Sequence, residues 1–222
     1  MPAETLRLLP ERVGLPRGRA ALSETEVGEA HRARIMQAVT DEVAEGGYAR
    51  TTVAGITARA RISRTTFYRW FAGKEEAFAA AHDAISEQLV QVIRDQAATI
   101  PDSAWEQRIA LGVRALALSL EARPTFARSF MVEVHGAGER LAEQRDRVVD
   151  RHARSLARVA DLAEAAGAPV RIPTEWEVVG AIGATEELFA RRIRHTPPRR
   201  RLVLTNLVDP VVTIHTALLR PQ

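Results

Sequence analysis

The sequence contains no cysteine, which excludes a disulfide scaffold, a thiol nucleophile and a cysteine-ligated metal site. Aromatic residues make up only 5% of the chain, and segments with the alternating pattern of a half-buried strand are missing. No apolar run reaches the length of about 18 residues that a transmembrane helix needs. The N-terminal segment lacks the apolar core of a secretion signal, so we expect a cytoplasmic protein.

Motifs of catalysis are missing as well. The sequence has no nucleophile elbow G-x-S-x-G, no phosphate-binding G-x-x-x-x-G-K-[ST] and no dinucleotide-binding G-x-G-x-x-G. Its six histidines are scattered, without the H-x-x-x-H spacing or the surrounding glutamates of a zinc site. We therefore expect no enzymatic activity, no catalytic residue, no metal site and no cofactor.

Positive charge is concentrated in one stretch of the chain. Residues 50–74 hold six basic residues and no acidic one, although the whole chain carries a net charge of only +3. Such a stretch is either an ordinary solvated surface or a surface that meets a polyanion such as nucleic acid. Solvated surfaces usually mix both signs of charge, so the position of the stretch in the fold has to decide.

The chain from residue 23 onward has the pattern of helices, with apolar residues at helical spacing such as Ile35, Val39 and Val43. Glycines and prolines separate the segments, and Pro210 predicts a kink or a break in the last one. The predicted helices cover residues 27–45, 52–60, 63–70, 74–97, 102–121, 124–134, 138–166, 174–195 and 199–219. We interpret 1–22 as a flexible arm, 23–72 as a small basic three-helix domain and 73–222 as a larger helical domain.

Two of the predicted helices have the pattern of a helix-turn-helix. The helices at 52–60 and 63–70 are short and are joined by a turn of three or four residues. Thr51 or Thr52 is placed to cap the first helix, and Ser63 is placed to cap the second. A helix of two turns can enter the DNA major groove, which is about 12 Å wide. The basic stretch therefore predicts a DNA-binding surface.

These residues carry a resemblance to a known family. The matching positions lie within residues 33–78 and include Gly47-Tyr48, Thr51-Thr52-Val53, Ile62-Ser63, Thr66-Phe67-Tyr68 and Lys74-Glu75. The segment resembles the DNA-binding domain of the tetracycline-repressor (TetR) family of transcriptional regulators. The resemblance implies an all-α protein in which an N-terminal helix-turn-helix binds DNA as a homodimer. It also implies that the remaining helices form a ligand-binding and dimerisation domain.

The expected DNA-contacting residues come from the resemblance together with the helix pattern. Arg61 stands at the turn, where the family usually has glycine, and a left-handed turn there would strain a residue with a Cβ by roughly 1–2 kcal/mol. The turn then has another geometry, or a phosphate contact of Arg61 offsets the strain. The expected DNA contacts are Thr52, Arg61, Ser63, Arg64, Thr65, Thr66, Tyr68, Trp70 and Lys74. Trp70 and Tyr68 have packing as an alternative role, and the arginines of the arm reach a minor groove or belong to a disordered tail.

The second domain contains aromatic residues suited to an apolar cavity between helices, the common design of small-molecule sites in helical proteins. The expected ligand-binding residues are Trp105, Phe126, Phe130, Met131, His135, Trp176, Glu186 and Phe189, with plain core packing as the alternative for each. Small residues on the helix at 174–195 allow a close approach of a second helix, so they and the last helix predict a four-helix dimer interface. Its expected residues are Gly180, Gly183, Ala184, Leu207, Val211, Ile214 and Leu218, with an intramolecular helix pair as the alternative.

The function that these patterns favour is that of a ligand-responsive repressor. It would bind a palindromic operator as a homodimer and would be released from DNA by a small apolar effector. Alternatives are a transcriptional activator or a ligand-independent regulator. Outside this class, the alternative is a helical enzyme or a protein-interaction scaffold whose basic surface meets an acidic partner.

Overall fold

The computed structural model describes residues 24–197 and 199–221, so the predicted arm at 1–22 lies outside it. Within these ranges the protein is built from helices, without a strand. Their bounds are α1 Glu24–Gly46, α2 Val53–Ala60, α3 Arg64–Tyr68, α4 Lys74–Ala97, α5 Trp105–Glu121, α6 Pro124–Met131, α7 Glu139–Ala165, α8 Glu175–Arg194 and α9 Val208–Leu219. Three short 3₁₀ helices connect them: η1 Tyr48–Arg50, η2 Glu133–Gly136 and η3 Thr205–Leu207. The expected all-α fold is confirmed.

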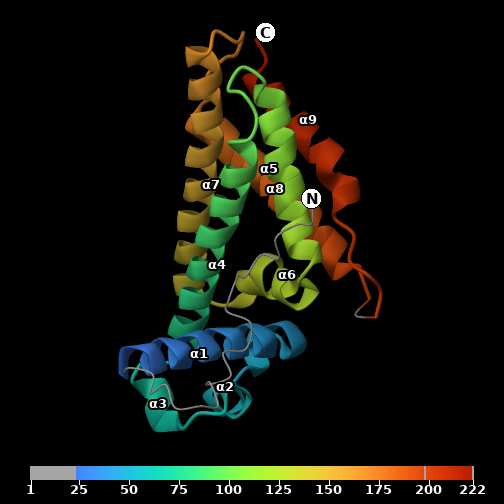
Figure 1. The fold of residues 1–222 in the computed structure, drawn as a ribbon. Helices are drawn as coiled ribbons and strands as arrows, with labels where there is room; N and C mark the ends of the chain where they lie inside the picture. The colour runs from blue at the N-terminus through green and yellow to red at the C-terminus, as the bar shows by residue number, and fades with distance from the viewer. Residues whose placement is uncertain (1–23, 198, 222) are drawn as a thin grey trace.

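The N-terminal helices pack around their own apolar core. Helix α1 lies across α2 and α3 at one end of the molecule (Figure 1), and its residues Ile35 and Val39 are fully buried. They meet Ile56 of α2 and Phe67 of α3, both also fully buried, and Phe71 just after α3. Because a buried Phe contributes about 1.5–3 kcal/mol relative to an exposed one, this cluster holds the short helix α3 against its neighbours.

Helix α4 connects this core with a second one. Its first turns place Phe78 and Ala81 in the N-terminal core, whereas Ile85 and Leu89 belong to the core of the C-terminal helices. Asp83 lies between these pairs and accepts hydrogen bonds from side chains of α7, one of them from Arg151 at 2.5 Å. A change in the position of α4 would therefore act on both cores.

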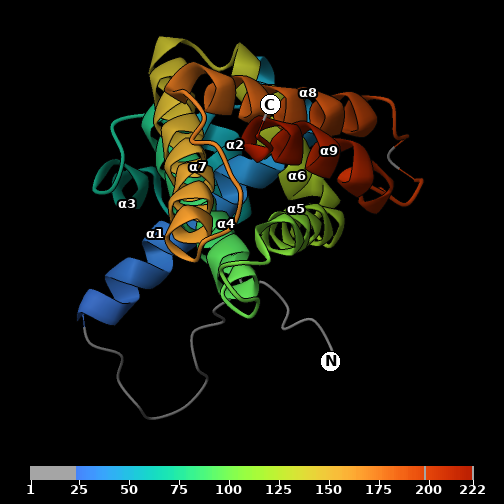
Figure 2. The same ribbon diagram turned by 90° about the horizontal axis from the view of Figure 1, so that it is seen from above.

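The C-terminal helices surround the second core in two groups. Helices α4, α5 and α7 are long and rise from the N-terminal helices, and the short α6 lies between them and α1 (Figure 1). Helices α8 and α9 lie side by side on another flank, as the view from above shows (Figure 2). Helix α8 packs on α6 and α7, and α9 packs on α5. None of the helices in the described ranges is long and apolar enough to cross a membrane.

The prediction of a last helix over 199–219 was wrong for the first half of this range. Helix α9 begins only at Val208, and the residues before it form a loop and the short η3. The carboxylate of Glu121 explains the difference, because one of its oxygens accepts from the backbone N–H groups of Leu204 and Thr205, each at 2.6 Å. Pro210 then lies in the first turn of α9, where a missing N–H breaks no helical hydrogen bond, so it causes no break.

Candidate nucleic-acid interface and effector cavity

Side-chain caps begin both short helices of the N-terminal unit. The hydroxyl of Thr52 accepts from the N–H of Gly55 at 3.1 Å, and the hydroxyl of Ser63 accepts from the N–H of Thr66 at 3.0 Å. Thr51 is buried instead and donates to the carbonyl of Gly47. The structure therefore selects Thr52 over Thr51 as the first cap and confirms the cap at Ser63.

The turn between α2 and α3 is left-handed at Arg61. Its φ of 54° and ψ of 51° make it the one residue other than glycine with a positive φ among those described. The turn thus keeps the strained geometry rather than an alternative one. The guanidinium of Arg34 on α1 donates to the carbonyls of Ala60 and Arg61, and these bonds hold the turn in place. The side chain of Arg61 itself is exposed.

Helix α3 turns one face to the core and the other to solvent. Phe67 faces inward, whereas Arg64, Thr65 and Tyr68 are exposed, Tyr68 to 56%. The ring of Tyr68 stands edge-on to that of Phe67, with 5.4 Å between the ring centres. Thr66 is half-buried, and its hydroxyl shares a hydrogen bond of 2.9 Å with the hydroxyl of Ser63. The outward face therefore offers a guanidinium, a hydroxyl and a phenol together.

Three of the six basic residues in 50–74 form hydrogen bonds or ion pairs within the protein. Arg59 pairs with Glu42 at 2.7 Å and with Glu45 at 2.5 Å, and Arg50 donates to the carbonyl of Gly46. Lys74 is the third, because its ammonium donates to backbone carbonyls. Arg61, Arg64 and Arg69 remain, and in the described part of the chain their side chains have no hydrogen-bond or ion-pair partner. These three guanidiniums are the ones available to a phosphate backbone.

Lys74 has a different place from the one expected. Its ammonium donates to the carbonyls of Tyr48 at 2.9 Å and Thr51 at 2.8 Å, and it lies 4.4 Å from the centre of the Tyr48 ring. The side chain is half-buried. Lys74 thus ties the start of α4 to the segment before α2, and two of its three N–H groups are not free for a phosphate.

Trp70 packs partly on α1. It is 37% exposed, and its ring lies over Gly28, where an added Cβ would come within 3.0 Å of the indole. Gly28 is a residue that the sequence analysis missed, because a glycine inside a helix gives no sign of what lies over it. Trp70 therefore has the packing role that was the alternative, while the exposed part of its ring adjoins the face of α3.

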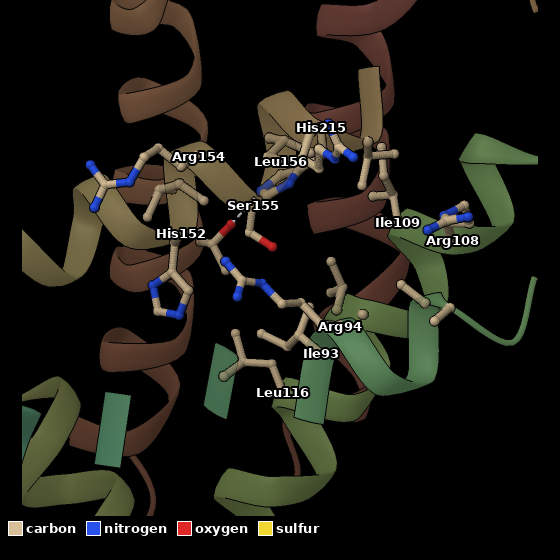
Figure 3. A pocket seen from close by; sticks show the side chains of 18 of the residues that line it. Ile93, Arg94, Arg108, Ile109, Leu116, His152, Arg154, Ser155, Leu156 and His215 are labelled. Carbon is tan, nitrogen blue, oxygen red and sulfur yellow. Dashed lines mark hydrogen bonds between the residues drawn. The ribbon is translucent and has the colours of Figure 1, made fainter. Parts of the chain in front are cut away.

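A cavity of about 570 Å³ lies within the C-terminal helices (Figure 3). Helices α4 to α9 all contribute to its wall, and most of the lining side chains are apolar. A volume of this size is typical of sites for small organic ligands. The apolar part of the wall includes Ile93, Ile109, Val113, Leu116, Phe130, Met131, Leu156, Val159, Leu162 and Ile182.

The polar groups of this cavity were mostly missed by the sequence analysis. The hydroxyl of Thr185 and Nε2 of His215 lie 2.8 Å apart on facing helices. Nε2 of His152 is shut off from solvent and has no partner within the described chain. Burial lowers the pKa of His152 to about 4 and lowers that of His215 as well. Both rings are therefore neutral near pH 7, and no local sequence pattern marks them, because they lie on separate helices.

The expected ligand-binding residues fall into three groups. Phe130, Met131 and Glu186 line the cavity. His135 borders only a much smaller space beside it. Trp105, Phe126 and Phe189 are buried in the core outside the cavity wall, so the alternative of plain core packing holds for them. The prediction that Trp176 lines the cavity was wrong, because this side chain is 81% exposed on the outside of α8.

The small residues of α8 lie open on the surface. Nothing lies within 4 Å of a Cβ built on Gly180 or Gly183, and Trp176 precedes them on the same side of the helix. Ala184, Leu207, Ile214 and Leu218 are partly exposed. Val211 is fully buried in the core of its own chain, so the prediction that it lies in the dimer interface was wrong.

Helix α6 lies between the cavity and the N-terminal helices. Phe130 and Met131 of α6 face the cavity, and the same helix packs against α1. Glu133 follows α6, pairs with Arg128 at 3.3 Å, and comes near Gly47 at the end of α1, so that an added Cβ there would lie 3.5 Å away. A shift of α6 would thus reach the segment that leads into α2.

Comparison with known proteins decides the family. The family model "Bacterial regulatory proteins, tetR family" matches residues 35–81, the segment that contains α2, α3 and the face described above. The chain belongs to the tetR family. This tetR-family protein is accordingly a DNA-binding transcriptional regulator, and the expected helix-turn-helix is confirmed.

Solved structures share the fold of this tetR-family chain. The fatty acid degradation regulator FadR from Bacillus halodurans is 21% identical with a TM-score of 0.71, covering 84% of this chain and 98% of its own. FadR from Bacillus subtilis, in complex with stearoyl-CoA, is 15% identical with a TM-score of 0.71 and coverages of 82% and 96%. GusR from Salmonella enterica is 20% identical with a TM-score of 0.67 and coverages of 89% and 98%. No curated protein sequence matches the chain.

Proposed function

We propose that this tetR-family regulator is a homodimeric repressor that binds an inverted-repeat operator and leaves it when a small molecule enters the cavity. The observation that carries the proposal is the exposed face of α3, whose Arg64, Thr65 and Tyr68 project from a rigid, doubly capped helix-turn-helix. Side chains near the start of such a helix reach base edges in the major groove. We assign the reading of bases to Arg64, at the start of α3, and phosphate contacts to Arg61 and Arg69, with Tyr68 as a further DNA contact at the end of the helix.

The dimer would form through the outer faces of α8 and α9. Gly180 and Gly183 leave room for a second helix to approach closely, and the exposed Trp176 supplies apolar area next to them. A two-fold axis at this face pairs each surface with its own copy. The two α3 helices would then enter successive major grooves about 34–36 Å apart, which requires an operator with inverted symmetry.

The effector would act through α6. A ligand shifts an equilibrium only if it binds the two conformations with different affinity. Because α6 forms part of the cavity wall and also packs on α1, a ligand that displaces Phe130 or Met131 would change the spacing of the two α3 helices. The relative FadR from Bacillus subtilis has been solved with stearoyl-CoA, which supports an effector with an apolar chain.

The division of the chain into an arm at 1–22, a DNA-binding domain at 23–72 and an effector and dimerisation domain at 73–222 is part of the proposal. Two separate apolar cores support the boundary between the latter two, and α4 belongs to both cores. We place the protein in the cytoplasm, and we assign it no enzymatic activity. Among the residues with described positions, no three potential metal ligands come together.

Selection of bound duplexes from a random pool tests this function. Enrichment of one palindromic sequence would establish base reading and two-fold symmetry together. Arg64→Ala should then reduce discrimination between the operator and a base-substituted operator, by about 1–3 kcal/mol at the contacted position. Arg114→Ala serves as the matched control, because Arg114 is an exposed arginine of α5 away from α3. No enrichment, or equal loss from both variants, would show that the α3 face does not read DNA.

A further inference from the structure

The cavity has an excess of positive charge at its wall. Four arginines and one carboxylate line it, and two of these groups are already paired. Arg108 pairs with Asp102, and Glu186 pairs with Arg145 at 2.5 Å. The other three arginines, Arg94, Arg154 and Arg158, have neither a carboxylate nor a hydrogen-bond acceptor as partner anywhere in the described ranges.

These three arginines share one part of the cavity. Arg94 lies in the last turn of α4, and Arg154 and Arg158 lie one turn apart on α7, which packs along α4. All three are exposed, so they form a rim rather than a part of the interior. Figure 3 shows Arg94 reaching from α4 towards His152 of α7, with Arg154 extending outward from the same helix. Like charges four residues apart on a helix repel, and a bound anion would remove that repulsion.

The interior has the opposite character. Below the rim most of the wall is apolar, and its histidines, His152 and His215, are neutral because burial lowers their pKa values. The one carboxylate among the lining residues, Glu186, is paired with Arg145. The interior therefore favours an uncharged body, whereas the rim favours an anion. A ligand that satisfies both must carry its charge at one end.

We infer that the cavity binds an anionic amphiphile, with its apolar body among Ile109, Leu116 and Leu156 and its anionic end held by Arg94 and Arg158. The inference rests on the proposed effector role of the cavity and names the ligand class for it. Arg154 adds positive charge at the same rim. Carboxylate and phosphate both match the planar guanidinium in charge and geometry, so the end group is either of these.

Direct binding measured by titration calorimetry tests the ligand class. The probes are unbranched fatty acids, the primary alcohols of the same chain lengths, and the coenzyme A thioesters of the same acids. We expect an acid or its thioester to bind at least about tenfold more tightly than the alcohol, because a charge-assisted hydrogen bond is lost in the alcohol. Binding of the free acid assigns a carboxylate end group, and binding of the thioester alone assigns phosphate. Equal affinity for acid, thioester and alcohol, or no binding of any probe, would overturn the inference.

Paired substitutions locate the end group. In the double variant Arg94→Gln/Arg158→Gln, binding of the anionic probe should weaken by about tenfold or more, whereas binding of the alcohol stays unchanged. Retained alcohol binding also shows that the variant is folded. Arg114→Gln removes the same charge from α5 outside the cavity and should change neither affinity. Equal weakening for the anion and the alcohol in the double variant would contradict the assignment of the rim.

The same probes separate this inference from the proposed function. If the anionic probe binds and the operator complex persists, the ligand class stands and effector control is wrong. If no anionic probe binds but the selected operator is bound with base discrimination, the ligand class is wrong and the DNA-binding function stands.

Discussion

Replacement of Lys74 by Met separates its internal role from a role in DNA binding. Methionine keeps most of the length and the apolar character of the side chain but removes the two hydrogen bonds to the carbonyls of Tyr48 and Thr51. Hydrogen bonds from a charged donor contribute about 1.5–3 kcal/mol each, and an ammonium over an exposed ring about 0.5–1 kcal/mol. Since Lys74 is half-buried and water replaces part of these interactions, we expect a loss of about 2–3 kcal/mol in the free energy of unfolding.

Urea denaturation followed by circular dichroism measures this loss, and hydrogen exchange locates it. The amides of residues 48–60 should exchange faster in Lys74→Met, because the segment before α2 is no longer tied to α4. The slope of DNA affinity against salt concentration, on logarithmic axes, should stay unchanged, since the lysine releases no counterion from DNA.

Arg69→Met is the matched control for Lys74→Met. Arg69 is exposed, and its side chain has no partner in the part of the chain that is described, so its removal should change stability by less than about 0.5 kcal/mol. The internal role of Lys74 would be refuted by the opposite result for stability and salt dependence. Unchanged stability of Lys74→Met, together with a salt dependence reduced by about 0.9, would make Lys74 a phosphate contact and not a structural tie.

Three further predictions concern the turn, the dimer and pH. Arg61→Gly should raise stability in urea by about 1 kcal/mol, because glycine adopts the left-handed conformation without strain; a loss would contradict this. Trp176→Ala should leave the melting temperature of the monomer unchanged but weaken the dimer in analytical ultracentrifugation, and an unaffected dimer would exclude the α8 face. His152 is neutral when folded, with a pKa of about 4 against 6.5 in the unfolded chain, so stability should fall as the pH drops from about 6.5 to 4. His152→Gln should make this pH dependence less steep without abolishing it, because buried His82, with a pKa of about 3, contributes in the same direction. An equally steep profile would assign the dependence to His82 and other groups.

The N-terminal unit shows how far local sequence rules reach. The caps at Thr52 and Ser63 follow from side chains and backbone N–H groups within three residues of each other, so the sequence alone predicts them. The inward position of Phe67 follows from helical spacing in the same way. The first half of the predicted helix 199–219 fails for the converse reason: Glu121, more than eighty residues away, accepts from the backbone N–H groups of Leu204 and Thr205, within that first half.

Trp176 and Val211 show what pattern cannot decide. Trp176 was expected to line the cavity, but it lies on the outside of α8. Val211 was expected in the dimer interface, but it lies in the core. Aromatic and aliphatic side chains suit a cavity, a core and an interface equally well, because each of these environments removes apolar area from water. Only the angle and the separation at which helices cross distinguish the three.

The amino-acid sequence by itself determined the helical class, the helix-turn-helix with its two caps, and the concentration of positive charge beside it. All of these depend on interactions between residues close in the chain. The tertiary structure decided which cations are free, since Arg59 and Lys74 are used by partners from α1 and from the segment before α2. It also decided that Arg94 of α4 and Arg158 of α7 border one cavity. The partners of these cations and the position of the two arginines depend on the packing of helices far apart in sequence. A local sequence pattern does not predict that packing.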